Sequence, residues 1–178
     1  MLKLYITDLQ AYNESSLVGR WVSLPKMQQE LQEDIKGILE CGEIDTGSSN
    51  HEEWFITDYK WEDISLFDID EYQDIFKLNE QLQSLEDLQT YQLKSISYLI
   101  DDGIATDIND AIDKLDDVVI HENQTMKDVA YNFIQEYYDI EKLPFILSTH
   151  IDYEAVGRDM YINGNYTEKG ADIFEYMG

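Results

Sequence analysis

The stretch Asp101–Asp117, DDGIATDINDAIDKLDD, contains seven aspartates and a single basic residue, Lys114. Its apolar residues follow a spacing of i, i+3, i+4 and i+7: Ile108, Ala111, Ile112 and Leu115. That spacing predicts an amphipathic helix over 101–117, because these side chains share about one third of the helix circumference. The aspartates at 107, 110, 113, 116 and 117 lie on the opposite half. We therefore expect one buried face and one face that carries little except carboxylate.

The whole chain also contains an excess of acidic residues. Its 178 residues include 38 Asp and Glu against 12 Lys and Arg, a formal net charge of −26, while 43% of residues are hydrophobic and 12% aromatic. This hydrophobic content predicts a folded protein rather than acidic disorder. Self-repulsion of this size disfavours the compact state. The charge argues against a binder of nucleic acid or of anionic membranes, and favours a basic partner, a metal or a high-salt habitat.

The acidic residues are concentrated in the middle of the chain. Residues 62–141 hold 21 acids against four lysines, a net charge of −17. Residues 1–61 have a net charge of −6, and residues 142–178 of −3. A salt-adapted surface should be acidic throughout, so this uneven distribution disfavours the halophile hypothesis.

The single Cys41 excludes an internal disulfide framework and fits a reducing compartment. Asp8 lies too near the N-terminus for the apolar region of a signal peptide. No apolar run approaches the length of a membrane-spanning helix. We therefore expect a cytoplasmic protein that binds no membrane.

Hydrophobic periodicity predicts an α+β fold made of three small lobes. Residues 1–61 form the first lobe, with strands at 2–9, 18–24 and 53–59 and a helix at 26–40 that ends at Cys41-Gly42; residues 10–16 and 43–52 are expected to be loops. Residues 62–103 form an acidic helical lobe, with helices at 71–85 and 86–102 and a stop at Gly103. Residues 104–178 form an α/β lobe. After the acidic helix, it contains a strand at 118–121, a helix capped by Thr125 and Asp128, short helices at 143–150 and 151–159, and a C-terminal hairpin.

Known catalytic and metal motifs are missing from the sequence. The histidines at 51, 121 and 150 lie in no HExxH or GxSxG pattern, and there is no glycine-rich phosphate loop. The sequence from Asp68 fails as an EF-hand, since Gln73 replaces the required glycine and Asn79 the required glutamate. We expect no cofactor, no metal and no enzymatic activity. A small hydrolase that uses a carboxylate pair stays as a minor alternative.

A nucleic-acid mimic accounts for the charge better. Duplex DNA carries one charge per about 1.7 Å of its axis, and aspartates spaced i, i+3 on a helix rise by about 4.5 Å, close to the 3.4 Å per-strand phosphate repeat. Such a protein would occupy a basic DNA-binding channel and would not itself bind nucleic acid. An acidic adaptor or chaperone for another basic nucleic-acid-binding protein is the alternative. The candidate phosphate-mimicking carboxylates are Asp68, Asp70, Glu71, Asp74, Glu80, Glu86, Asp87, Asp101, Asp102, Asp107, Asp110, Asp113, Asp116 and Asp117.

Four segments resemble the ArdA antirestriction proteins. They are YNESSLVGRWVSLP at 12–25, EEWFITDY at 52–59, IDYEAVGRDM at 151–160 and IFEYM at 173–177. They occur in the family's order and at similar spacing, so the resemblance covers essentially the whole chain. The longer loop between Cys41 and Glu53 departs from the family pattern and leaves open the outline of the first lobe.

The resemblance implies a function and an architecture. Members are carried on mobile genetic elements and act as stoichiometric DNA mimics that protect incoming DNA from type I restriction–modification enzymes. They have an elongated, curved, acidic surface, three lobes, and a C-terminal lobe through which homodimers form. The IDYEAVGRDM segment corresponds to the stretch associated with antirestriction and dimer contact. Tyr153, Gly157 and Arg158 are therefore candidate dimer-interface residues, and a helix cap with an internal salt bridge is the alternative.

Overall fold

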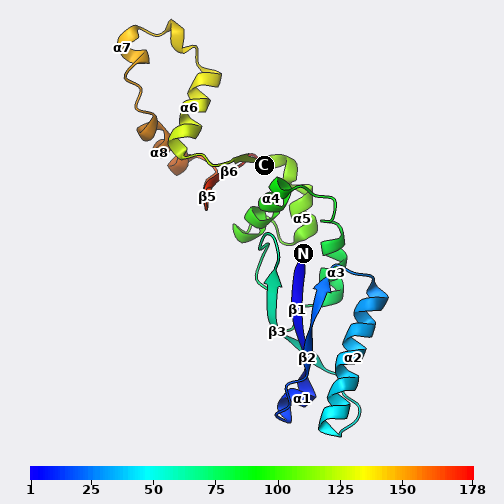
Figure 1. Ribbon diagram of the computed structural model, residues 1–178. Helices are drawn as coiled ribbons and strands as arrows, with labels where there is room; N and C mark the ends of the chain where they lie inside the picture. Colours follow the sequence, from blue (N-terminus) through cyan, green and yellow to red (C-terminus); the bar gives the residue numbers. More distant parts are fainter. The chain divides into compact units, whose positions relative to one another are not determined.

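The computed structural model describes all 178 residues and combines helices with two small antiparallel sheets, which confirms the α+β class (Figure 1). The chain divides into two compact units, Met1–Asn109 and Asp110–Gly178. The three-lobe division at 61 and 103 stays a prediction. None of the helices has the length and apolar content needed to cross a bilayer.

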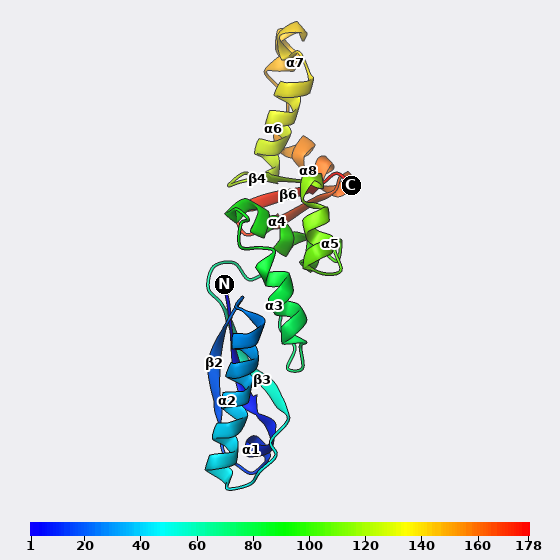
Figure 2. The ribbon, with the colours of Figure 1, turned by 90° about the vertical axis from the view of Figure 1, so that its right-hand side faces the viewer.

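The sheet of the first unit has strand β1 (Leu2–Asp8) at its centre. It pairs antiparallel with β2 (Gly19–Leu24) on one side and β3 (Trp54–Trp61) on the other, giving the order β2-β1-β3. The predicted strands are confirmed. Alternate residues of β1 are fully buried, and they lie on the face that helix α2 (Gln28–Thr46) covers (Figures 1 and 2). These core side chains are Leu2, Leu4, Ile6, Leu31, Ile35 and Ile38.

The predicted loop at 10–16 is wrong in its first half, where a short helix α1 (Leu9–Asn13) follows β1 directly. The Asp8 carboxylate accepts a hydrogen bond from the Ala11 backbone N–H at 2.9 Å, which caps this helix. An aspartate at the end of a strand therefore also starts a helix.

The predicted end of α2 at Cys41-Gly42 is also wrong, because the helix continues to Thr46 and ends at Gly47, whose φ is +72°. Inside the helix, only a residue without a side chain fits at position 42, because the Asp8 and His51 side chains lie against it. A Cβ at this position would overlap the Asp8 carboxylate and crowd the His51 ring. The predicted loop at 43–52 therefore begins with the last turn of a helix.

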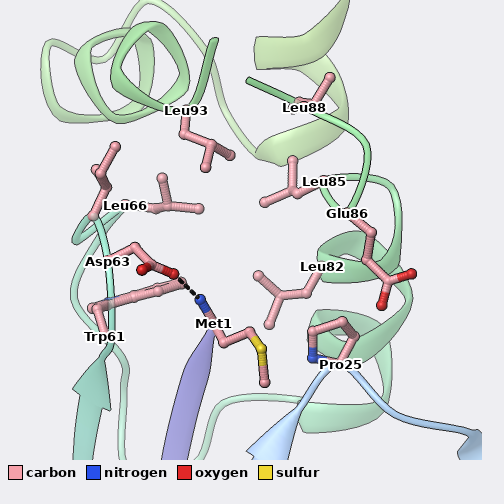
Figure 3. Close-up of a pocket in the computed structure, with 11 residues that line it drawn as sticks. Met1, Pro25, Trp61, Asp63, Leu66, Leu82, Leu85, Glu86, Leu88 and Leu93 are labelled. Atoms are coloured by element: carbon pink, nitrogen blue, oxygen red, sulfur yellow. Dashed lines mark hydrogen bonds and ion pairs between the residues drawn. The ribbon is translucent and has the colours of Figure 1, made fainter. Parts of the chain in front are cut away.

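Two helices follow β3, as predicted, although both begin later than expected: α3 (Ile75–Gln83) and α4 (Thr90–Asp101). The Asp74 carboxylate caps α3 by accepting hydrogen bonds from the backbone N–H groups of Phe76 and Lys77. Gly103, with φ of +69°, lies just beyond the end of α4, as predicted. An apolar hollow of about 190 Å³ lies between the end of the sheet and these helices (Figure 3). Its walls include Pro25, Trp61, Leu66, Leu82, Leu85, Leu88 and Leu93.

The predicted single helix over 101–117 is wrong. Helix α4 ends at Asp101, a turn around Gly103 follows, and only Ile108–Asp113 forms helix α5, which crosses the division between the two units. A 3₁₀ turn, η1 (Leu115–Asp117), leads into the next strand. The predicted apolar face holds in part, since Ile108 and Ala111 are buried while Ile112 and Leu115 are only half-buried.

The second unit has its own sheet, with the order β4-β6-β5 and antiparallel pairing throughout. The strands are β4 (Val118–His121), β5 (Tyr166–Lys169) and β6 (Asp172–Tyr176). This confirms the predicted strand and the predicted C-terminal hairpin, whose turn uses Gly170 at φ of +64°.

Helices α6 (Met126–Tyr137) and α8 (Tyr153–Asn163) pack against each other and onto this sheet. Between them lie the 3₁₀ turn η2 (Ile140–Lys142) and the short helix α7 (Phe145–Ser148). A buried cluster of Met126, Val129 and Ile173 joins the helices to β6.

The predicted cap of α6 is confirmed. Thr125 accepts a hydrogen bond from the Asp128 N–H, and the Asp128 carboxylate in turn accepts hydrogen bonds from the backbone N–H and the hydroxyl of Thr125. These hydrogen bonds hold the pKa of Asp128 below its ordinary value.

Tyr166 on β5 has a raised pKa, and this predicts a pH effect on stability. Burial, followed by a hydrogen bond with Glu175, raises its pKa to about 12. The unfolded state, with an ordinary pKa near 10, then loses this proton first as pH rises, so the stability conferred by neutral Tyr166 is complete below pH ~10 and is lost as pH approaches ~12. We expect Tyr166→Phe to flatten the fall in unfolding free energy between pH ~10 and ~12, measured by urea titration. Identical slopes in both proteins would contradict this assignment.

Candidate partner-binding surface

The first predicted carboxylates lie on a segment at 67–71 that runs beside strand β3. The Tyr59 hydroxyl donates a hydrogen bond to the Asp68 carboxylate at 2.8 Å, and the Ile56 N–H donates to the Glu71 carbonyl at 2.9 Å. The hydrogen bond to Asp68 is the main reason that the pKa of Tyr59 is raised. The exposed carboxylates of this segment are therefore attached to a sheet rather than carried on a loose loop.

Two carboxylates of the predicted set have local structural roles. Asp70 accepts a hydrogen bond from the Tyr72 N–H at 2.9 Å, and Asp74 accepts from the Phe76 and Lys77 N–H groups at 3.1 Å. Both side chains are nevertheless exposed. In Asp74, both hydrogen bonds use the same oxygen, Oδ1.

Three others, Glu80 on α3 and Glu86 and Asp87 in the turn after it, are exposed to solvent. The ion pairs of this unit use different carboxylates, among them Asp34 and Glu62. Carboxylates of this kind can receive Lys or Arg side chains from another molecule without breaking an internal ion pair.

The last predicted carboxylates of the first unit lie around the broken acidic helix. Asp101 and Asp102, at the end of α4, are exposed, whereas Asp107, just before α5, is half-buried. The break therefore separates carboxylates that the sequence pattern placed on one continuous helix.

In the second unit, Asp110 is half-buried and forms an ion pair with Lys114 at 2.8 Å. Asp113 and Asp116 are exposed, and Asp117 is half-buried. The one lysine of the acidic stretch is thus used internally, at the i, i+4 spacing that favours such pairs.

The three candidate dimer-interface residues lie on α8 in different environments. Gly157 is buried, and a Cβ there would overlap the Met126 carbonyl, so this glycine allows α8 to approach α6 closely. The Tyr153 ring contacts the Tyr131 ring edge-on, with centroids 5.1 Å apart. Arg158 is exposed and lines a shallow hollow of the second unit.

The sequence reasoning missed an exposed apolar feature in the second unit. Helix α7 presents Phe145, Ile146 and Leu147, which we call the apolar tip, with Phe145 81% and Ile146 68% exposed. Nearby in the same unit lies an apolar hollow of about 370 Å³. Its walls include Phe133, Ile134, Tyr138, Ile140, Leu143, Ile151 and Val156. Three consecutive large apolar residues cannot all face one side of a short helix, so at least one of them must lie outside the core. The run Phe145-Ile146-Leu147 could therefore have predicted an exposed apolar side chain from the sequence alone.

The histidines occupy structural positions. His51 is buried; its Nδ1 donates to the Asp8 carboxylate at 2.6 Å, and its Nε2 lies 3.1 Å from the Ser48 hydroxyl. This order of groups resembles a serine-hydrolase triad. However, the Glu14 carboxylate lies 3.3 Å from the same hydroxyl, where it would repel a developing oxyanion. On β4, His121 faces Glu175 of β6 at 3.2 Å.

No group of three or more His, Cys, Asp or Glu side chains is arranged to hold a metal ion.

A comparison with models of protein families matches residues 4–174 to the family described as antirestriction protein (ArdA). No curated protein matches the chain.

Proposed function

Because this chain belongs to the ArdA family of antirestriction proteins, we propose that it inhibits type I restriction–modification enzymes by occupying their DNA-binding channel in place of duplex DNA. The observation that carries this proposal is the set of exposed carboxylates on the segment beside β3, on α3 and at the end of α4. They belong to the part of the chain with a net charge of −17. The inhibitor would act by binding alone, without turnover.

The binding energy of such an inhibitor is a sum of many small terms. An ion pair at an exposed position contributes roughly 0.2–1 kcal/mol. A DNA-binding channel, however, presents many Lys and Arg side chains, and charged surfaces of opposite sign also accelerate association. Affinity that comes from such contacts weakens as salt rises, as it does for DNA itself.

Titration of a purified type I enzyme on unmodified DNA tests the proposal. We expect cleavage to stop at a fixed, low ratio of this protein to enzyme, because each inhibitor molecule or dimer occupies one channel. Full cleavage at a large excess of inhibitor would reject the proposal and favour the alternative, an acidic adaptor for another basic protein.

We further propose that the protein forms a homodimer through its second unit. The support is the apolar tip, together with the apolar hollow lined by Phe133 and Tyr138 in the same unit. Exposed apolar patches rimmed by polar residues mark protein–protein contacts. In a twofold dimer the same patch is used by both copies, so one tip could enter the partner's hollow and receive the partner's tip in return.

The dimer proposal predicts the effect of a charge in the apolar tip. We expect Ile146→Asp to convert the dimer to a monomer at micromolar concentration, because an unpaired carboxylate would be buried at the interface. Sedimentation equilibrium measures the mass. Ile44→Asp is the matched control, since Ile44 is 83% exposed on α2 in the other unit, and it should leave the mass unchanged. A dimer that persists in Ile146→Asp would contradict this interface.

A further inference from the structure

Three aromatic side chains of the first unit are in contact with one another, and we call them the aromatic row: Tyr12, Phe55 and Tyr72. The Phe55 ring, on β3, contacts the Tyr12 ring, on α1, edge-on, with centroids 5.3 Å apart. The Phe55 ring also stacks with the ring of Tyr72, which precedes α3, with centroids 6.5 Å apart and planes inclined by 25°. The row thus joins three parts of the chain that are distant in the sequence.

The row is attached to the face of the first sheet that points away from α2. Phe55 is the register partner of Thr7 on β1, so both side chains point to the same face. Thr7 alternates with the buried Ile6, which lies on the face that α2 covers. The hydrogen bond from the Ile56 N–H to the Glu71 carbonyl holds the segment next to Tyr72 against β3. The sheet therefore fixes the position of the row.

The two outer rings of the row are open to solvent. Tyr12 is 49% and Tyr72 68% exposed, whereas Phe55 is buried. Aromatic rings that are held by a buried neighbour lose little conformational freedom when another molecule packs on them. Exposed Tyr side chains of this kind are enriched among the residues that contribute most to binding at protein interfaces. The row therefore has the features of a preformed binding surface.

The charge around the row indicates what kind of group it binds. Within four positions of each ring, the sequence contains no lysine or arginine. Exposed carboxylates flank all three rings in the sequence: Glu14 near Tyr12, Glu52 and Glu53 near Phe55, and Asp70 and Glu71 near Tyr72. An aromatic face attracts a cation, and a carboxylate accepts the hydrogen bonds that the cation donates. The surroundings of the row therefore favour a cationic side chain over an apolar one.

We propose that the aromatic row and its flanking carboxylates bind an arginine side chain of the restriction enzyme's DNA-binding channel. The guanidinium plane stacks on the ring of Tyr72, the more exposed of the two tyrosines, and its N–H groups donate to a neighbouring carboxylate such as that of Glu71. Arginine fits better than lysine, because its guanidinium group is planar, more weakly hydrated and able to donate two parallel hydrogen bonds. This inference rests on the proposed function, and it adds a contact that the phosphates of DNA do not provide.

Replacement of Tyr72 tests the role of the ring. We expect Tyr72→Leu to weaken binding of the full-length protein to a type I methyltransferase core about 3- to 10-fold, the loss of one cation–π contact, measured by isothermal titration calorimetry. Tyr72→Phe keeps the aromatic face and should bind as the wild type does. Tyr91→Leu is the matched control, since Tyr91 is 56% exposed on α4 of the same unit, and it should also leave the affinity unchanged.

Two peptides of equal charge, nona-arginine and nona-lysine, test the preference for a guanidinium group without the enzyme. We expect the wild type to bind nona-arginine more tightly than nona-lysine. The double variant Tyr12→Leu/Tyr72→Leu should reduce this ratio of affinities about 3- to 10-fold, because the stacking contact favours arginine. Its affinity for nona-lysine should stay close to that of the wild type, since every carboxylate is retained.

The outcomes separate this inference from the proposed function. Core binding by the wild type that is unchanged in Tyr72→Leu would overturn the arginine site and leave the proposed function intact. No core binding by the wild type would reject the proposed function, and the arginine site with it. An equal ratio of peptide affinities in the wild type and the double variant would overturn the preference for arginine. A change from dimer to monomer in Tyr72→Leu, measured by sedimentation equilibrium, would assign the row to contacts between copies and would also overturn the proposal.

Discussion

Neutralising four exposed carboxylates together is expected to weaken inhibition of a type I enzyme about 30-fold. The four are Glu71, Glu80, Glu86 and Asp87, changed to Gln or Asn. They are exposed and cap no helix, so their loss should not unfold the protein. At roughly 0.5 kcal/mol for each exposed ion pair, the four contribute about 2 kcal/mol. Each single change should therefore raise the inhibitory concentration only about two- to threefold, measured by titration of cleavage on unmodified DNA.

A matched variant separates the position of the charge from its amount. Changing Glu30, Glu33, Glu52 and Glu53 to Gln removes the same charge from exposed positions outside residues 62–141. We expect this control to lose less inhibition than the central set. A single central substitution that abolished inhibition in a folded protein would contradict the distributed mimic and would indicate one dominant contact.

Asp8→Ala is expected to destabilise the protein by about 3–5 kcal/mol, the largest single-site effect on folding. The Asp8 and His51 side chains are completely buried and their nearest atoms are 2.6 Å apart. Removing the carboxylate leaves His51 without its partner and also removes the cap from α1. Unfolding in urea, followed by circular dichroism, gives the free energy directly.

Asp8→Asn is the control for this prediction. It keeps an oxygen that can cap α1 and places an amide NH2 group that can donate to the His51 ring nitrogen, but it removes the charge, so its loss should be clearly smaller. Because Asp8 is buried and is not among the carboxylates proposed to contact the partner, the folded fraction of either variant should inhibit normally. An Asp8→Ala protein with an unfolding free energy within about 1 kcal/mol of wild type would show that the buried pair adds little.

Where local signals and the tertiary structure agree, the sequence predicts the fold. Alternating apolar residues located β1, and the pattern of Thr125 followed by Asp128 located the start of α6. These signals act within a few residues, so they can be read without knowing what packs against them.

The predicted helix bounds are wrong where contacts with residues distant in the sequence determine the structure. Cys41-Gly42 has the form of a helix end, yet Gly42 lies inside α2 because the Asp8 carboxylate occupies the space of its missing side chain. The helix predicted over 101–117 contained its own stop, Gly103, within an apparently continuous pattern.

The candidate surface was predictable in composition but not in detail. The sequence cannot tell that Asp74 caps a helix, that Lys114 neutralises Asp110, or that Tyr59 attaches Asp68 to a strand. These contacts join residues whose proximity depends on the fold. They divide the predicted carboxylates into those with structural roles and those, such as Glu80, that are simply exposed.

Displacement of duplex DNA from a type I methyltransferase core tests the central proposal most directly. With labelled DNA bound to the core, added protein should release the DNA with saturable, competitive behaviour. The affinity of the protein for the core should fall steeply between about 50 and 200 mM salt, as expected for a charged surface that replaces phosphates. Inhibition of cleavage without any displacement of DNA would contradict DNA mimicry and place the binding site outside the channel.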